Sequence, residues 1–319
     1  MKAVIVLGGD SLAAQAAEID SLMAPIAGRM AEICLWVFCD QAPEVFPHFS
    51  FSLSGIDVLP MAAPLLPEVL LDGLTRMAAK GPKDLFVFPG TGSGPGLATR
   101  LAFRLGGSSC VQVQTCEPGD AGKLTLTKPA YGGNMEARIC LNSGPFCLAP
   151  EKGAFRPFPM GKAACPVKVQ TGHSPFVPDW VKESLLIPDD PGQGLEKAEQ
   201  VLVAGNGVGS REGVKELERI ARALGAGLGA SRPVVMNGWA PMETLVGASG
   251  AILSPRVCIA AGVSGTRVFA KGIEKSQFIV AVNTDPRALI FDQADVGVVD
   301  DLHRILPELE RLVREDQEK

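Results

Sequence analysis

Short apolar stretches alternate with helical patterns along most of this chain, and this alternation restricts the possible folds more than any other feature. Residues 2–7, 33–39 and 85–89 are apolar at nearly every position, so both faces of each predicted strand are expected to be buried. Helical periodicity follows the first strand over residues 11–32, where Pro25 is expected to kink or interrupt the helix. The pattern predicts parallel sheets covered by helices, the α/β class.

The rhythm changes between residues 110 and 170. Short strands separated by turn residues follow one another there, with no helix predicted between them. The expected strands are VQVQT, KLTLTKPAYGG, EARICL, FCLAP and CPVKVQT. We therefore expect an antiparallel layer appended to the first parallel sheet.

A proline-rich, acidic stretch separates the two halves, and we place the boundary between an N-terminal α/β domain of residues 1–190 and a second domain of residues 191–319. The second domain is predicted to open with a strand over 200–204, a glycine turn and a helix over 211–224. That order is typical of a doubly wound parallel sheet of the dinucleotide-binding type. Later strands are expected at 233–236, 257–261 and 278–282, and a last helix at 302–314.

Charge, hydropathy and cysteine usage exclude several classes of protein. The net charge is −5 and no basic stripe is visible, which argues against nucleic-acid binding. No apolar run approaches the roughly 18 residues of a membrane span, so no integral membrane segment is expected. The eight cysteines include no CxxC pair, which predicts no metal site and reduced thiols. With no targeting pattern in the first residues, we expect a cytoplasmic protein.

Glycine, serine and asparagine are concentrated in the turns that follow or connect the predicted strands of the second domain. These turns are 205–209 (GNGVG), 229–232 (GASR), 246–250 (VGASG), 262–266 (GVSGT) and 283–285. In an open parallel sheet, loops at the carboxyl ends of strands line the crevice where ligands bind. Small residues let backbone amides approach phosphate, and Arg232 adds a charged donor. The turns together predict a dinucleotide site that binds a pyrophosphate.

A further glycine-rich turn, residues 90–96 (GTGSGPG), opens a predicted helix in the first domain. Such a turn can bind phosphate through its backbone N–H groups. It lacks both the GK[ST] ending of a P-loop and the GxGxxG spacing, so a tight structural turn is the preferred interpretation.

Several motifs of the second domain occur in one recognisable order. They include GASR (229–232), NGW (237–239), VGASG (246–250), IAAGVSG (259–265), VAVNTDP (280–286), IFDQAD (290–295) and ILPEL (305–309). In order and spacing this half resembles the flavin domain of electron transfer flavoprotein alpha subunits, and the first half is similar more loosely, through GLATRLAFRLGG and KPAYGGN. The resemblance implies one FAD on the second domain.

The same resemblance implies a heterodimer in which the first domain packs against an electron transfer flavoprotein beta subunit, which carries AMP or a second FAD. The heterodimer would relay electrons between a flavin dehydrogenase, an acyl-CoA or related dehydrogenase, and a redox acceptor. No catalytic residue and no metal ligand are expected in this chain, because the redox chemistry belongs to the flavin.

Carried over position by position, the resemblance implies FAD contacts from the turns and from the start of the last helix. The expected cofactor-binding residues are Asn206, Ser231, Arg232, Val246, Gly247, Ala248, Ser249, Ser264, Gly265, Thr266, Arg267, Val268, Phe269, Asn283, Asp301 and Leu302. Arg232 matches the family arginine near the isoalloxazine ring, where a cation favours the anionic reduced flavin. Asp301 is also expected to cap the last helix.

The sequence departs from the family pattern at several of these positions. Asn206 stands in place of a usual arginine, Ala248 and Ser249 in place of Gln-Thr, and Val268 and Phe269 in place of Gln-His. A phenyl ring cannot donate the hydrogen bond that the histidine gives to the flavin pyrimidine edge. We interpret the chain as a divergent member with a shifted flavin potential. A scaffold subunit without flavin, and a nucleotide-dependent enzyme with its own substrate, are the alternatives.

Overall fold

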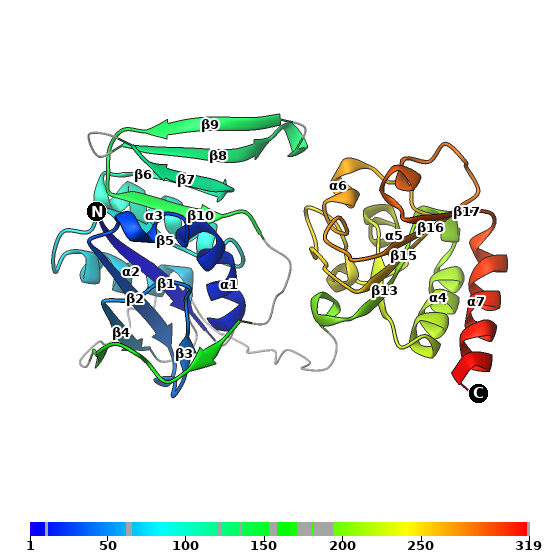
Figure 1. Cartoon of the computed structure of the whole chain (residues 1–319), viewed down its shortest axis with the longest axis horizontal. Coiled ribbons are helices and arrows are strands. Elements are labelled where there is room, and N and C mark those ends of the chain that lie inside the picture. The colour runs from blue at the N-terminus through cyan, green and yellow to red at the C-terminus, as the bar shows by residue number, and fades with distance from the viewer. Residues whose placement is uncertain are drawn as a thin grey trace. The chain divides into compact units, whose positions relative to one another are not determined.

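The computed structural model describes residues 1–9, 12–61, 66–119, 123–133, 135–152, 158–170, 180 and 194–317 (Figure 1). The chain forms two compact units, Met1–Ile187 and Pro188–Lys319, and each contains its own parallel sheet. The α/β class with two sheet-based units is therefore confirmed, whereas the expected boundary between residues 190 and 191 lies outside the described residues.

The first unit is built on a seven-stranded parallel sheet with the strand order β12-β4-β2-β1-β5-β10-β6. Its strands are β1 (Lys2–Gly8), β2 (Glu32–Cys39), β4 (Gly55–Pro60), β5 (Leu85–Val87), β6 (Ser108–Val113), β10 (Phe146–Pro150) and β12 (Val167–Val169). Its helices are α1 (Leu12–Met23), α2 (Pro67–Ala78) and α3 (Gly94–Leu105). Helix α1 ends at Met23, so the helical pattern predicted over residues 11–32 is interrupted before Pro25 instead of kinked. The strand order reverses beside β1, which pairs with β2 on one side and with β5 on the other.

The two faces of this sheet have separate cores, because successive strand residues point to opposite sides. Ile5 and Leu7 of β1 pack into a core with α1, and Val4 and Val6 pack into a second core with α2 and α3. The apolar runs that predicted buried strands therefore supply both cores.

A three-stranded antiparallel sheet of β7 (Thr115–Pro118), β8 (Leu124–Ala130) and β9 (Met135–Leu141) is the appended layer that the sequence predicted (Figure 1). Leu124 and Leu126 of β8 pack into the α1-side core. The prediction was wrong for the segments that form β6, β10 and β12, because these join the main sheet in parallel. The strands with which they pair lie far away in the sequence. The local pattern therefore could not distinguish parallel pairing in the main sheet from antiparallel pairing in the appended layer. A two-stranded ladder joins β3 (Phe46–Pro47) and β11 (Met160–Gly161).

The second unit is built on a five-stranded parallel sheet with the order β14-β13-β15-β16-β17. The strands are β13 (Gln200–Ala204), β14 (Gly227–Ala230), β15 (Val257–Ala261), β16 (Ile279–Asn283) and β17 (Val296–Val299). Helices α4 (Arg211–Ala223), α5 (Arg232–Met236) and α7 (Leu302–Gln317) contribute to the core on one face, and α6 (Arg267–Ala270) contributes to the core on the other.

The strand predicted over residues 233–236 was wrong, because this segment is helix α5. Its Pro-Val-Val-Met sequence is apolar and β-branched, which favours a strand, but proline at the start of a helix satisfies the helical φ angle without losing a hydrogen bond. The strand lies just before it, in Gly227–Ala230, and pairs with β13 along its whole length. Over the described residues, no helix combines the length and the apolarity needed to cross a bilayer.

Candidate functional site

The carboxyl edge of the second unit's sheet gathers the polar turns that the sequence analysis singled out. Because the five strands are parallel, the loops that follow them all leave at this one edge. The turn 246–250 belongs to no strand of the sheet but is held beside it, since the Val246 N–H donates to the Ala230 carbonyl at 2.9 Å. The predicted convergence of the turns is therefore present in the fold.

Two glycine turns meet at the position where the strand order reverses, between β13 and β15. The Gly207 N–H donates to the Gly262 carbonyl at 3.0 Å, and Gly262 has a φ of +67°. A Cβ added at Gly205 would collide with the Gly262 carbonyl oxygen. The two backbones approach so closely that only glycine fits, which keeps side chains out of the centre of the edge.

Ser231 follows β14 and is the clearest sign that this edge binds a ligand. Its side chain is buried, only 4% of the residue is exposed, and among the described residues its Oγ has no hydrogen-bond partner. It precedes helix α5 without capping it. Buried hydroxyl groups are almost always hydrogen-bonded, and leaving one unpaired costs about 1–3 kcal/mol. The residues present therefore fit a bound group that pairs with this oxygen.

Arg232 supplies positive charge next to Ser231. Its Nη2 donates to Ser249 Oγ at 3.2 Å, which links the start of α5 to the turn 246–250. The same turn is fixed from its other side, where the Ala248 N–H donates to the Val268 carbonyl at 2.8 Å. An exposed guanidinium held between two turns can interact with an anionic ligand at this edge.

Two other expected site residues are engaged in holding the edge together. Asn283 donates from Nδ2 to the Val263 carbonyl at 2.8 Å and accepts from the Asp285 N–H through Oδ1 at 3.0 Å. Asp301 accepts from the His303 N–H at 2.9 Å, so the prediction that it caps the last helix is confirmed. Both side chains fix the turns that follow β16 and β17.

All the expected cofactor-binding residues lie on these turns or on the residues next to them. Exposed at the edge are Asn206, Arg232, Ala248, Ser249, Ser264, Thr266, Arg267, Val268 and Asp301, whereas Asn283 is half-buried. Buried beneath them are Ser231, Val246, Gly247, Gly265, Phe269 and Leu302. The Phe269 ring packs into the core with Val203 and Ile273 instead of filling the edge. That these residues contact a cofactor stays a prediction.

The sequence analysis did not single out Gly272, which follows α6. A Cβ at this position would collide with the Gly247 backbone nitrogen, so Gly272 lets α6 approach the turn 246–250. The sequence offers one signal for this close approach, an isolated glycine just after a short helix. Many glycines that allow no close approach occur in the same context, so the signal is not specific.

Thiol chemistry plays no part at this edge. All eight cysteines are free. Cys258 of β15 is fully buried, and burial raises the pKa of its thiol to about 12, so it stays protonated and unreactive at neutral pH.

Comparison with known proteins gives two family matches. Residues 194–274 match the electron transfer flavoprotein FAD-binding domain, and residues 60–173 match the electron transfer flavoprotein domain. A putative electron transfer flavoprotein subunit, YgcQ of Escherichia coli strain K12, is 35% identical over 248 residues, which cover 77% of this chain and 84% of the relative.

Two further relatives extend the comparison. FixB of Azorhizobium caulinodans is 32% identical over 284 residues, covering 86% of this chain and 77% of FixB. The electron transfer flavoprotein subunit alpha of Paracoccus denitrificans is 33% identical over 185 residues, covering 58% of this chain and 59% of that protein. The second-unit match includes the turns that contain Ser231 and Arg232.

Proposed function

The chain belongs to the alpha-subunit family of electron transfer flavoproteins, and from this membership we propose that the carboxyl-edge turns of the second unit hold its FAD. The second unit contains the FAD-binding domain of the family, and the role of the protein is electron transfer. Family membership implies a beta subunit as partner. The isoalloxazine ring of FAD accepts and donates the electrons, and the residues of this chain bind, orient and electrostatically tune it.

The observation that carries the assignment of the site is the buried, unpaired Oγ of Ser231 beside turns made of small residues. Backbone N–H groups of glycine turns are suited to a pyrophosphate, and Ser231 and Ser264 add hydroxyl groups at the same edge. Arg232, held by Ser249, supplies a cation that stabilises negative charge on the cofactor. Because Phe269 packs into the core, the exposed Arg267 is the side chain at the start of α6 that can donate to the ring.

The proposal extends to the partners and the compartment. In a heterodimer with the beta subunit, the chain would take electrons from an acyl-CoA dehydrogenase or a related flavin dehydrogenase and pass them to a redox acceptor. Free cysteines are typical of a reducing compartment, which supports a cytoplasmic location.

The test is the flavin content of the chain purified together with its beta subunit, compared between two variants at one exposed turn position. Ser264→Asp places a carboxylate beside the proposed phosphate or ring position and is expected to weaken FAD retention at least about tenfold. Ser264→Asn has a similar size without the charge and is expected to retain FAD. An intact, colourless wild-type heterodimer would instead support the flavin-free scaffold, and equal flavin content in both variants would refute the placement at Ser264.

A further inference from the structure

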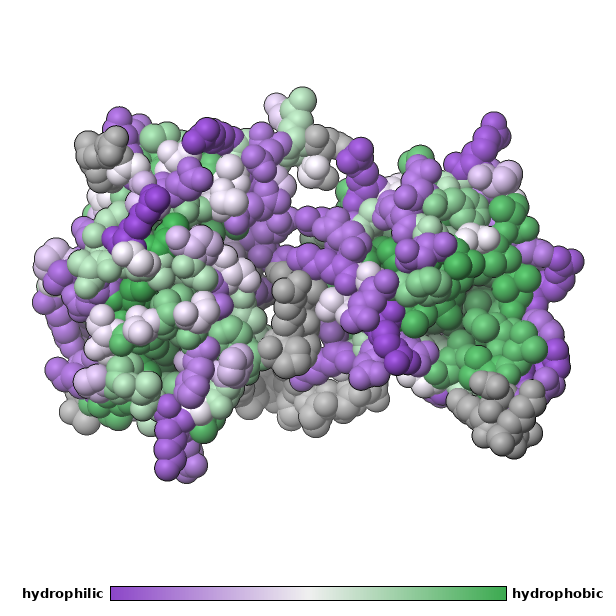
Figure 2. Space-filling view, viewed as in Figure 1, coloured by the Kyte–Doolittle hydropathy of each residue, from purple (hydrophilic) through white to green (hydrophobic). Residues whose placement is uncertain are grey.

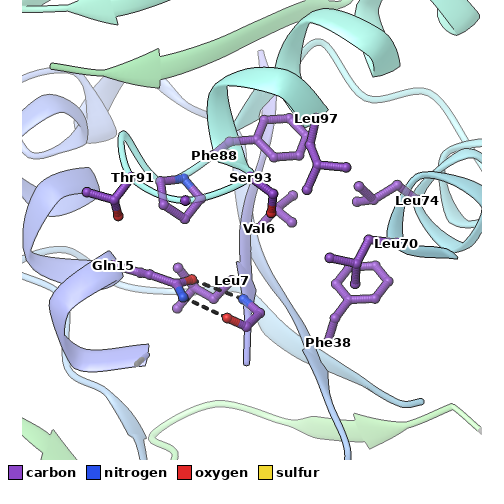
Figure 3. Close-up of a pocket in the computed structure, with 14 residues that line it drawn as sticks. Val6, Leu7, Gln15, Phe38, Leu70, Leu74, Phe88, Thr91, Ser93 and Leu97 are labelled. Carbon is purple, nitrogen blue, oxygen red and sulfur yellow. Dashed lines mark hydrogen bonds between the residues drawn. The ribbon is translucent and has the colours of Figure 1, made fainter. Parts of the chain in front are cut away.

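A cavity of about 380 Å³ lies in the first unit, far in sequence from the flavin site (Figure 3). It is found at the carboxyl end of β1, where the strand order reverses between β1 and β5. In open α/β sheets this reversal point is where ligands bind. Its volume falls within the range of ligand-binding pockets, so it is a candidate binding site.

The cavity has one apolar wall. Phe38, Leu70, Leu74, Phe88 and Leu97 line it from β2, α2, the end of β5 and α3 (Figure 3). Such a wall suits a flat, largely apolar ring system.

The floor of the cavity is fixed before any ligand arrives. Gln15 of α1 donates from Nε2 to the Gly8 carbonyl at 2.6 Å and accepts from the Gly8 N–H at 3.0 Å (Figure 3). These two bonds hold the last residue of β1 in place, so the cavity is preformed and binding needs little ordering of the chain.

The polar part of the cavity is formed by the turn Thr91–Gly94, which leads into α3 (Figure 3). Within the described part of the chain, the N–H groups of Gly92 and Ser93 have no acceptor, and the exposed Ser93 hydroxyl does not cap the helix. Gly92 has a φ of +58°, which favours glycine at this turn. These donors, together with the positive end of a twelve-residue helix, can bind one anionic group.

Size and charge limit what the cavity can hold. Its volume lies at the lower end of the range of roughly 300–1,000 Å³ for ligand sites, which suits one nucleoside and not a dinucleotide. None of the described residues that line it carries a charge, but the carboxylate of Glu18 lies at the start of the turn, where it accepts from the Gly90 N–H at 2.8 Å and from the Thr91 hydroxyl at 3.4 Å. A helix terminus acts as about half a positive charge, enough for one phosphate but not for a chain of them.

We propose that this cavity binds a nucleoside monophosphate, with the base against the apolar wall and the phosphate at the Gly92–Ser93 turn. The cavity is lined by residues of the first unit only, so this proposal does not depend on where FAD binds in the second unit. The glycine turn at residues 90–96, which the sequence alone favoured as purely structural, then has a second role.

The experiment is calorimetric titration of adenosine monophosphate into the complex of the full chain with its beta subunit. Ser93→Asp places a carboxylate at the turn, whereas Ser93→Asn is a neutral match, and neither variant removes a helix cap because the Ser93 hydroxyl does not cap α3. Any site on the beta subunit is the same in every sample. We expect Ser93→Asp to lower the affinity of one set of adenosine monophosphate sites at least about tenfold. Ser93→Asn is expected to change the affinity of the same sites less than about threefold.

A wall variant tests the position of the base. Leu70→Phe adds volume inside the cavity and is expected to weaken adenosine monophosphate binding while leaving FAD content unchanged. Identical stoichiometry and affinity in wild type, Ser93→Asp and Leu70→Phe would overturn the proposal. Inorganic phosphate that binds the wild type as tightly as the nucleotide would also overturn it, because the apolar wall would then contribute nothing.

Discussion

In both units of this protein the order of the parallel strands reverses beside the first strand, but the loops at the carboxyl edge of the sheet differ. In each, one strand pairs with its successor on one side and with a later strand on the other, and a glycine turn follows at the reversal point. The second unit adds polar turns after its other strands, a buried serine with an unpaired oxygen and an exposed arginine. The first unit has an apolar cavity with one glycine turn and no charged lining residue among those described.

Under the two proposals, the sheet provides the location of a site and the composition of the loops determines its ligand. The turns at the carboxyl edge of the second unit, together with the charge of Arg232, suit a large, multiply charged cofactor. One turn beside Phe38 and Phe88 suits a small ligand with a single charge. On the face seen in Figure 2, both units carry hydrophilic and hydrophobic side chains.

Matched glycine substitutions at the two reversal points should have the largest effects on stability, and their effects on flavin content should differ most clearly between the two units. A Cβ at Gly205 would collide with the Gly262 carbonyl oxygen, and one at Gly94 would collide with the Pro89 carbonyl oxygen. Gly205→Ala and Gly94→Ala are therefore each expected to destabilise their unit by about 3 kcal/mol. Only Gly205→Ala should lose FAD, measured as flavin per chain after desalting.

Gly28→Ala is the control for this pair, because its Cβ would meet no heavy atom within 4 Å. It should leave both unfolding and flavin content unchanged. Equal loss of flavin from Gly205→Ala and Gly94→Ala would mean that the two edges are not independent.

Arg232→Ala tests the charge that distinguishes the second edge. The substitution removes a cation beside the proposed ring position, so the anionic reduced flavin should lose about 1–2 kcal/mol of stabilisation. The midpoint potential is then expected to fall by tens of millivolts, at about 59 mV for each 1.4 kcal/mol in a one-electron step. A redox titration measures the shift.

Ser249→Ala is the matched control for Arg232→Ala. It removes the hydrogen-bond partner of Arg232 but keeps the charge, so its shift in potential should have the same sign and be smaller. If Arg232→Ala leaves the potential unchanged while FAD stays bound, Arg232 does not lie beside the ring.

Ser231→Ala tests whether the unpaired oxygen belongs to a ligand site. Without flavin, the variant should be as stable as the wild type or up to about 1 kcal/mol more stable, since an unsatisfied buried hydroxyl is removed. With flavin bound, it should lose about tenfold in FAD affinity, equivalent to roughly 1.4 kcal/mol. Urea unfolding of the deflavinated and reconstituted protein measures both effects, and a loss of stability in the flavin-free state would contradict the interpretation.

Much of the fold could be predicted from local patterns, because buried parallel strands such as β1 and β15 are continuously apolar. The failures occurred where tertiary pairing overrides local preference. Gly227–Ala230 has poor strand propensity but pairs fully with β13, whereas the β-branched segment after it becomes α5 because Pro233 favours a helix start. The parallel placement of β10 depends on β5 and β6, which no local signal reveals.

The turns of the candidate site could be predicted because each follows or adjoins an apolar run, but the direction of each side chain could not. Val268 and Phe269 are neighbours in the sequence, yet successive residues of a helix differ by about 100° in direction. Val268 is exposed and Phe269 is buried in the core. The burial of the unpaired Ser231 oxygen likewise depends on the tertiary packing around α5.

The smallest expected effects are on stability and concern two ion-paired carboxylates, Glu32 in the first unit and Glu310 in the second, neither of which belongs to a proposed ligand site. In the first unit, a hydrogen bond from Cys34 and pairing with Lys2 and Lys83 lower the pKa of Glu32 to about 2. In the second unit, a bidentate bond from Arg219 and a further pair with Arg314 lower the pKa of Glu310. A carboxyl group whose pKa is lower in the folded state stabilises the protein above its unfolded pKa of about 4.5, and this stabilisation is lost as the pH falls toward the folded value.

Glu32→Gln should therefore cost less than about 1 kcal/mol at pH 7, because partly exposed pairs contribute little. The difference from wild type should shrink by more than half at pH 3. Glu310→Gln should show the larger cost at pH 7, since only 7% of the Glu310 side chain is exposed and water cannot replace its arginine partners as easily. Calorimetric unfolding between pH 3 and pH 7 measures both. A difference that does not vary with pH would mean that the carboxylate charge stabilises neither unit.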